Sequence, residues 1–286
     1  MTAIEDRIER TGVSAPPLTS ELITLAIGRG RARRSWRLPR SVERFVGVVL
    51  LFACWEVGGR AGWVSPRQLP APSTVLTAGW DMARNGVLGP ALWASLQRVL
   101  WGLAFGIPIG AGLALIAGLF RLGDDLVDAN VQMLRFVPII ALQPLLIVWL
   151  GIGETVKVFL IVIGVAFPIY VNTSAAIRSI HPNFRELAQV VGLGRLQTIR
   201  KVILPGALPG FIVGLRLATG IAWLLLVFAE QLNANKGIGF LIIHAQALSQ
   251  TDVIMVGVVL YAVLGLFSDA LMRTVERALL RWQPGR

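Results

Sequence analysis

Residues 181–210 read HPNFRELAQVVGLGRLQTIRKVILPGALPG and separate two long apolar stretches of the chain. This segment carries Arg, Lys and Gln side chains and ends in two Pro-Gly pairs, so it is too polar for the interior of a bilayer. We expect two short helices in it, over 184–191 and 195–203, followed by a return to apolar sequence. The pattern predicts a helical protrusion from a membrane protein, shaped to dock in a groove of another protein.

The boundaries of the first helix rest on local signals. Asn183 followed three residues later by Glu186 is an N-cap and capping-box pattern, which predicts that the helix starts here. Either Gly192 or Gly194 is suited to the left-handed conformation that ends many helices. A helix that is capped at both ends forms a rigid element, whereas a flexible linker absorbs an applied force.

The composition predicts an all-α integral membrane protein. Of 286 residues, 55% are hydrophobic and 15% charged, against roughly 25% charged in soluble domains, and the mean hydropathy is +0.69. A transmembrane helix needs about 20 mainly apolar residues. Six blocks meet or approach this length, and the third is short and interrupted by prolines. We predict six transmembrane helices at 45–63, 91–120, 136–150, 158–177, 206–230 and 253–272.

The distribution of Lys and Arg orients these helices. Twenty of the 27 basic residues lie in four segments that would share one side of the membrane, namely 1–44, 121–135, 178–201 and 273–286. The opposite loops hold four, at 64–90, 151–157 and 231–252. Basic loops stay in the cytoplasm, so we expect both termini and the protrusion there. This bias accounts for the net charge of +11 and removes the reason to expect nucleic acid as a partner.

Two regions follow from this organisation. Residues 1–44 combine Pro, Ser, Thr and many Arg residues, which predicts a basic and largely disordered cytoplasmic tail. Residues 45–286 form the predicted six-helix transmembrane domain, with the coupling helices of segment 181–205 between its fourth and fifth helices.

The second predicted helix has a row of small residues at four-residue spacing. Residues four apart lie on one face of a helix, and small residues there let a neighbouring helix approach closely. The row comprises Gly102, Gly106, Gly110, Ala114 and Gly118. It predicts tight packing and says little about activity, because such rows occur in many polytopic proteins.

Four polar residues are candidates for lining a substrate pathway. Gln143 adjoins the kink expected at Pro144, while Asn172 and Thr173 lie in or near the cytoplasmic end of the fourth helix. Arg216 in the fifth helix suits an anionic substrate. Each has an alternative interpretation: a structural kink for the first, hydrogen bonds between helices for the next two, and a membrane-interface anchor for the last.

Other ionisable residues occur in the predicted helices. Burial of charge in a membrane is costly, so such residues carry more weight than polar ones. They mark a functional site, or alternatively they lie near an interface, where their side chains reach water. They are Glu56, Arg98 and Glu230.

The chain has no sequence motif of a soluble enzyme. It lacks G-x-x-x-x-G-K-[ST], the loop that cradles nucleotide phosphates. Its two histidines, His181 and His244, fall on opposite sides of the membrane in the predicted topology, and Cys54 is the sole cysteine. We therefore expect no catalytic residue, no metal site and no cofactor bound by this chain.

The segment ELAQVVGLGRLQTIRKVILP resembles the EAA loop of ATP-binding-cassette importer permeases. One position departs from the pattern, since Leu187 stands where many members have Ala. Flanking segments, including VPIIALQPLLIVWLGIGE and FPIYVNTSAAIRSI, are similar to the branch that imports aliphatic sulfonates, taurine, nitrate or bicarbonate, and the resemblance covers about 90–282. The matching positions of the loop are Glu186, Ala188, Gly192, Ile203, Leu204 and Pro205.

The resemblance implies a function and a set of partners. The chain would be the permease subunit of a type I importer for a small anion in the bacterial cytoplasmic membrane, in contact with lipid and paired with a second copy of itself. Two ATPase subunits would bind ATP and Mg and dock on the loop, and an extracytoplasmic binding protein would deliver the substrate. The expected docking residues are Arg185, Glu186, Leu187, Ala188, Val191, Gly192, Leu193 and Gly194.

Two other functions are compatible with a polytopic chain. An ion-coupled secondary transporter or channel predicts inverted repeats and a buried carboxylate at mid-membrane. The sequence has no convincing repeat. A nonconducting membrane scaffold would explain the glycine row but not the proline-interrupted helices.

Overall fold

The computed structural model describes residues 40–282 except 121, 122, 124, 125, 127 and 135, and all of its regular elements are helices. The predicted tail over 1–44 falls almost entirely outside the described residues. The chain divides into two units, residues 1–51 and residues 52–286. Helix α3 (Arg40–Arg60) contributes residues to both units. The second unit, which begins at Phe52, contains all the other helices that the structure describes.

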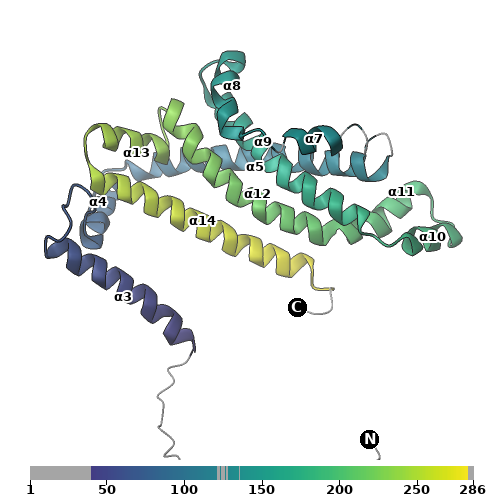
Figure 1. The fold of residues 1–286 in the computed structure, drawn as a ribbon, viewed down its shortest axis with the longest axis horizontal. Coiled ribbons are helices and arrows are strands. Elements are labelled where there is room, and N and C mark those ends of the chain that lie inside the picture. Colours follow the sequence, from purple (N-terminus) through teal and green to yellow (C-terminus); the bar gives the residue numbers. More distant parts are fainter. Residues whose placement is uncertain (1–39, 121–122, 124–125, 127, 135, 283–286) are drawn as a thin grey trace, which may run out of the picture. The chain divides into compact units, whose positions relative to one another are not determined.

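The helices of the second unit follow one another with short connections (Figure 1). After α3 come α4 (Pro72–Arg84), α5 (Leu88–Leu119), α7 (Ala129–Leu134), the 3-10 turn η2 (Ile139–Leu142), α8 (Gln143–Leu150), α9 (Glu154–Arg178), α10 (Pro182–Val190), α11 (Arg195–Thr198), the π-helical turn η3 (Ile199–Ile203), α12 (Leu204–Asn233), α13 (Ile238–Ala247) and α14 (Thr251–Leu279).

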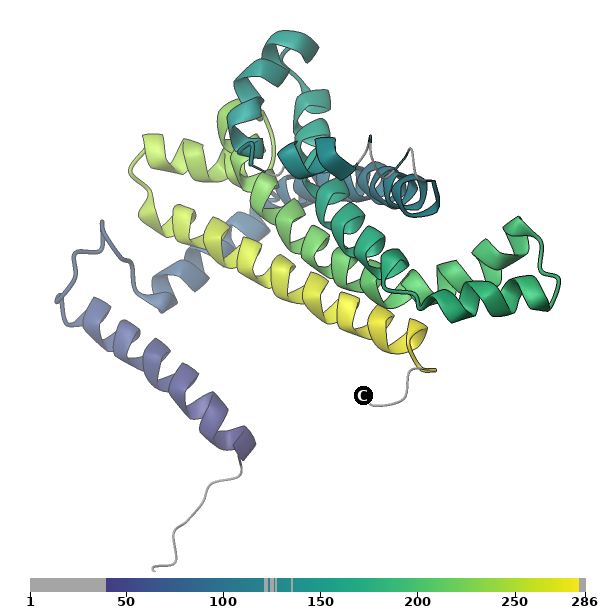
Figure 2. The ribbon, with the colours of Figure 1, turned by 45° about the vertical axis from the view of Figure 1, so that its right-hand side comes forward.

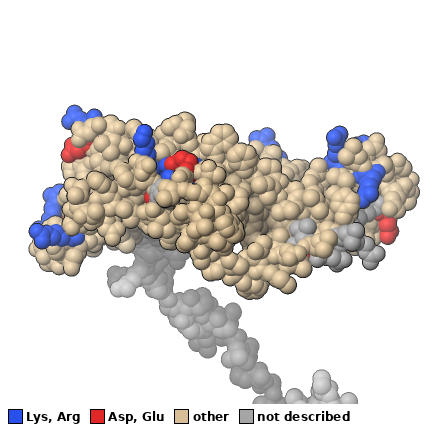
Figure 3. Space-filling model, turned by 90° about the horizontal axis from the view of Figure 1, so that it is seen from above, with Lys and Arg blue, Asp and Glu red and all other residues tan. Residues whose placement is uncertain are grey.

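Four of the described helical segments are long and apolar enough to cross a membrane. They are Leu88–Leu119, Glu154–Arg178, Arg195–Leu232 and Thr251–Leu279, which match the predicted second, fourth, fifth and sixth spans. On the face drawn in Figure 3, Lys and Arg are confined to a few patches and uncharged residues cover most of the rest. The chain is a multi-pass membrane protein.

Helix α9 is the central helix of the second unit and packs between α5 and α12 (Figure 2). The small-residue row of α5 faces it. An added Cβ at Gly106 would lie 2.6 Å from Val165 Cγ1, and one at Gly118 would lie 2.6 Å from Ile177 Cγ2. Small residues on α12 do the same on the opposite side, where Gly214 faces Pro168. The predicted close approach of helices along the row is confirmed.

The predicted third span differs from a kinked helix. Pro138 caps the 3-10 turn η2, which leads directly into α8, and Pro144 lies in the first turn of α8. Proline is tolerated in a first turn because the backbone N–H that it lacks has no helical partner there. The span is therefore a pair of short pieces that end at Gly151, whose φ of 76° is left-handed.

Candidate functional site

The predicted protrusion is a helical hairpin made of α10 and α11, which extend beyond the ends of α9 and α12 in both views (Figure 1 and Figure 2). The predicted cap at its start is wrong. His181, not Asn183, is the N-cap, and its Nδ1 accepts the Asn183 backbone N–H at 3.3 Å. Pro182 fits the first helical position, so the helix begins before Asn183, and Glu186 is left exposed.

A glycine turn joins the two helices. Gly192 has φ of 76°, and Leu193 N–H donates to the Ala188 carbonyl at 2.9 Å, which closes α10 as a Schellman-type end. Gly194 is not left-handed. It is the N-cap of α11, where its N–H donates to Gln197 Oε1 at 3.2 Å. Of the two predicted terminators, Gly192 ends the helix and Gly194 starts the next one.

The second helix of the hairpin continues into the membrane helix. The chain runs from α11 through the π-helical turn η3 into α12, so the helix predicted over 195–203 and the span predicted over 206–230 form one continuous helical segment. At the base, Ile203 and Ala207 are buried against Ile177 of α9, with Ile180 and Ile199 packed around them. The hairpin is thus joined rigidly to two long helices.

An apolar surface is exposed on the hairpin. The exposed fractions are 58% for Leu187, 84% for Val190 and 67% for Val191, whereas Ala188 is buried. Arg185 lies in α10, but its side chain is not among those described. Exposed apolar side chains on a polar segment are typical of an interaction surface.

An ion pair lies near the base of the hairpin. Arg178, the last residue of α9, donates to Asp128 Oδ1 at 2.8 Å, and the Tyr170 hydroxyl donates to the same oxygen at 2.8 Å. The hydrogen bond from Arg178, more than any other contact, lowers the pKa of Asp128 to about 2. This carboxylate therefore stays charged at neutral pH.

A buried cluster of charged residues lies at the opposite ends of α9 and α12. Its centre is Glu230, whose side chain has no exposed surface. Ser95 Oγ lies 2.7 Å from Oε1, while the Gly239 N–H and the Tyr261 hydroxyl donate to Oε2 at 2.8 and 3.1 Å. Arg98 Nη1 donates to Oε1 at 2.5 Å. The carboxylate thus connects α5, α12, α13 and α14.

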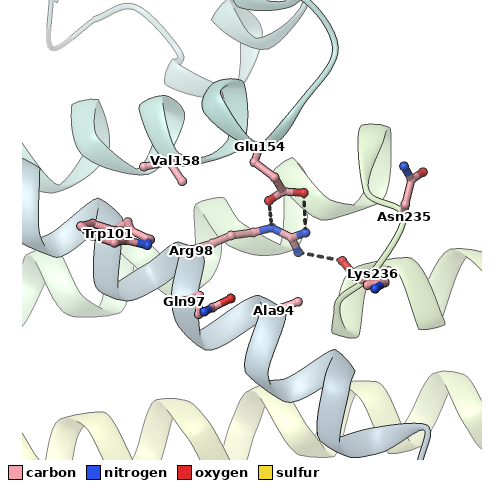
Figure 4. A pocket seen from close by; sticks show the side chains of 8 residues that line it. All are labelled: Ala94, Gln97, Arg98, Trp101, Glu154, Val158, Asn235 and Lys236. Atoms are coloured by element: carbon pink, nitrogen blue, oxygen red, sulfur yellow. Dashed lines mark hydrogen bonds and ion pairs between the residues drawn. The ribbon is translucent and has the colours of Figure 1, made fainter.

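The Arg98 guanidinium has a second carboxylate partner, and Figure 4 shows the pair. Its Nε and Nη2 donate to the two oxygens of Glu154 at 2.5 and 2.8 Å, and its Nη1 also donates to the Lys236 carbonyl at 2.7 Å. Lys157 Nζ donates to Glu154 Oε1 at 2.8 Å. The two cationic side chains are almost fully buried, at 5% and 3% exposure, but the Glu154 side chain is 61% exposed.

A pocket of about 360 Å³ opens beside this pair. It is lined by Ala94, Gln97, Arg98, Trp101, Glu154, Val158, Asn235 and Lys236 (Figure 4). Arg98 and Glu230 do not reach water, as the alternative interpretation of these residues requires, because their side chains are buried and pair with each other. The signal available in the sequence was the presence of opposite charges in two apolar helices, but it did not indicate which residues pair.

The four predicted pathway residues do not form one cluster. Gln143 is buried in α8 and Thr173 in α9, and Gln143 Oε1 and Thr173 Oγ1 are buried oxygens without a hydrogen bond. Asn172 Nδ2 donates to the Pro168 carbonyl of its own helix. Arg216 is not a lone cation, since its Nε donates to Asp269 of α14 at 2.9 Å. No described hydrogen bond or ion pair joins any two of these four residues.

The fold defines a class of protein: a polytopic helical membrane protein with an exposed helical hairpin between two of its long helices. The family described as binding-protein-dependent transport system inner membrane component matches residues 106–281. The chain belongs to this family, whose members are the membrane-spanning permease subunits of ATP-binding-cassette importers. ATP hydrolysis in this family takes place in partner subunits.

Curated relatives cover most of the chain. The chain is 45% identical over 249 residues to the putative aliphatic sulfonates transport permease protein SsuC of Escherichia coli. The aligned region covers 87% of this chain and 91% of that protein. It is 33% identical to the taurine transport system permease protein TauC of the same organism, over 92% of this chain and 98% of that one. The nitrate import permease protein NrtB of Synechocystis is 27% identical, with coverages of 83% and 89%.

Solved structures share the fold. A bacterial ABC transporter involved in the import of the acidic polysaccharide alginate matches with a TM-score of 0.60 and 18% identity, over 84% of this chain and 93% of that one. The MetNI methionine ABC transporter in an inward-facing conformation matches with a TM-score of 0.54 and 22% identity, over 69% and 98%. At these identities the likeness concerns the fold alone.

Proposed function

We propose that this chain is the permease subunit of an importer for a small organic or inorganic anion, with aliphatic sulfonates as the preferred class and taurine, nitrate and bicarbonate as the related ones. The observation that carries this proposal is the 45% identity to an aliphatic sulfonates permease protein over 91% of its length. The chain itself binds no cofactor in this proposal, and ATP and Mg belong to the ATPase subunits.

The hairpin is the proposed docking site of an ATPase subunit. The docking surface comprises Arg185, Glu186, Leu187, Ala188, Val191, Gly192, Leu193 and Gly194. Three features support it: the exposed apolar side chains of α10, the glycine turn that closes this helix, and the packed base at Ile203. A hairpin joined to α9 and α12 can transmit movement of the ATPase subunits to both helices, because Ile203 and Ala207 at its base pack against Ile177 of α9.

We infer the following assembly and topology. Six spans, formed by α3, α5, the η2–α8 pair, α9, α12 and α14, put both termini and the hairpin in the cytoplasm of a bacterium, in agreement with the excess of Lys and Arg in those segments. The importer contains two copies of this chain, two ATPase subunits and one extracytoplasmic binding protein. The exposed Val263, Leu266 and Phe267 of α14 supply an apolar face for lipid or for the second copy.

Gln143, Asn172, Thr173 and Arg216 stay proposed as pathway residues. Support for two of them comes from buried oxygens that lack a hydrogen bond, at Gln143 and Thr173. Such an oxygen is costly to bury, and a conformational state that exposes it to a water-filled path removes the cost. The ion pair with Asp269 makes Arg216 the weakest candidate of the four.

An ion-coupled transporter needs a buried carboxylate that releases and binds a cation or proton. Glu230 is buried, but Arg98, Ser95, Gly239 and Tyr261 occupy its oxygens. A carboxylate held in this way is a structural anchor. This argument and the family membership both favour the ATP-driven mechanism.

The test is uptake and ATP hydrolysis by the complete importer in proteoliposomes. Glu186→Lys or Gly192→Asp is expected to abolish the stimulation of ATP hydrolysis by loaded binding protein while the permease still inserts. Gly89→Asp is the control, because Gly89 is an exposed residue of α5 outside the hairpin and an added Cβ there meets no atom within 4 Å. Normal stimulated hydrolysis in both altered complexes would contradict the docking proposal, and sulfonate uptake without any ATPase subunit would contradict the importer.

A further inference from the structure

We propose that the pocket beside Arg98 is a transient binding site for the oxoanion group of the substrate, and that the Glu154 carboxylate occupies this site when substrate is absent. This inference rests on the proposed function, because an importer of small anions needs a place along its path where an anion is held.

The Arg98 guanidinium has two differently occupied edges. Nη1 is held inside the protein by Glu230 and by the Lys236 carbonyl. Nε and Nη2 point to the pocket, where they bind the two oxygens of Glu154 (Figure 4). Planar, bidentate donation of this kind fits the oxygens of a sulfonate as well as those of a carboxylate. The buried edge fixes the guanidinium, so the outer edge stays preorganised if its partner is exchanged.

Glu154 is the exchangeable partner. It is the first residue of α9, and its side chain is 61% exposed although it contacts two almost fully buried cations. A carboxylate that leaves Arg98 and Lys157 here returns to water by side-chain rotation alone. The departing carboxylate regains its hydration, and a substrate oxoanion that takes its place keeps the two buried cations from being left uncompensated. Glu230 cannot leave Arg98 for water in the same way, because its side chain has no exposed surface.

The remaining lining matches a small organic anion. The Lys236 side chain is exposed, and no carboxylate among the described residues pairs with its ammonium group. Gln97 and Asn235 add amide groups at the polar part of the wall, while Trp101 and Val158 supply an apolar part. Without Glu154, the Arg98, Lys157, Glu230 and Lys236 charges sum to +2. The pocket therefore combines excess positive charge with a surface for a short aliphatic tail.

The experiment measures direct binding of pentanesulfonate by calorimetry. The permease–ATPase complex is placed in nanodiscs of zwitterionic phosphatidylcholine, without the binding protein. Glu154→Gln removes the competing charge and is expected to lower the Kd for pentanesulfonate roughly tenfold, the change that about 1.4 kcal/mol produces. Lys236→Gln should raise the Kd several-fold, and methanesulfonate should bind less tightly than pentanesulfonate.

Glu56→Gln is the matched control, because Glu56 is also a helical carboxylate paired with an arginine, Arg60, but it does not line the pocket. The Kd of the Glu56→Gln variant for pentanesulfonate should equal that of the unaltered chain. The Lys236 variant changes an exposed side chain, so it tests the site even if the Glu154 variant folds poorly.

Either of two results would overturn the inference: a Kd for pentanesulfonate that Glu154→Gln leaves unchanged or raises, or a Kd that Lys236→Gln leaves unchanged. A parallel uptake assay separates the two proposals. If the complete importer takes up sulfonate normally while these variants bind it as before, the pocket assignment fails and the proposed function stands. If the importer takes up no anion, the proposed function fails.

Discussion

The buried pair between Arg98 and Glu230 offers a strong test of what stabilises this fold. Arg98→Met keeps most of the length of the side chain and removes its charge. The Glu230 carboxylate, which has no exposed surface, then keeps the donors from Ser95, Gly239 and Tyr261 but loses its cation. Removing one partner of a buried pair typically costs about 3–5 kcal/mol, because the other charge stays buried and uncompensated.

The matched comparison is Arg216→Met. Arg216 also lies in a spanning helix and pairs with a carboxylate, but its side chain is 44% exposed and that of Asp269 is 32% exposed. Asp269 keeps a second cationic partner there, since Arg273 Nε donates to its Oδ2 at 2.8 Å, so we expect a smaller cost than for Arg98→Met. The difference between the two losses of unfolding free energy therefore measures the cost of leaving a buried carboxylate without its cation, and not the general effect of removing an arginine.

Reversible unfolding of the purified protein in mixed micelles, followed by tryptophan fluorescence, measures both free energies. Combining Arg98→Met with Glu230→Gln should restore part of the lost stability, with a coupling energy of about 0.5–3 kcal/mol. The reasoning is refuted if Arg98→Met costs no more than Arg216→Met, or if the effects of the two substitutions in the double variant simply add.

Two further predictions concern packing and pH. Gly106→Ala should destabilise the fold by about 1–3 kcal/mol, since its Cβ would lie 3.0 Å from the Val162 carbonyl oxygen. Gly112→Ala, whose Cβ meets no atom within 4 Å, should not destabilise it. Equal unfolding free energies for the two variants would contradict this prediction. The pKa of Asp128 is lowered from 3.8 to about 2, so its stabilisation is full above pH 4 and is lost as the pH falls towards 2. Asp128→Asn should make the free energy of unfolding less dependent on pH between pH 4 and pH 2. An unchanged pH dependence in the variant would count against the ion pair.

Most of the long helices were predictable from the sequence, because a membrane span is a local and periodic property. The spacing of small residues also predicted that α5 would pack closely on a neighbour. It did not identify α9 as that neighbour, since any helix with a complementary surface satisfies the same pattern. The start of α10 was missed for a local reason: His181 competes with Asn183 for the cap, and the first-turn preference of Pro182 favours the earlier start.

The class of protein and the positions of most of the long apolar helices could be predicted from the sequence alone, as could a glycine at the end of α10, although not the choice between Gly192 and Gly194. These depend on hydrophobicity, charge bias and backbone freedom, each of which is a property of a few adjacent residues. Only the tertiary structure decided that Arg98 pairs with Glu230 and Glu154, which lie 132 and 56 residues away along the chain. A charged residue in an apolar helix looks the same in sequence whether it faces water, lipid or a partner, because its surroundings depend on the rotation and neighbours of the helix.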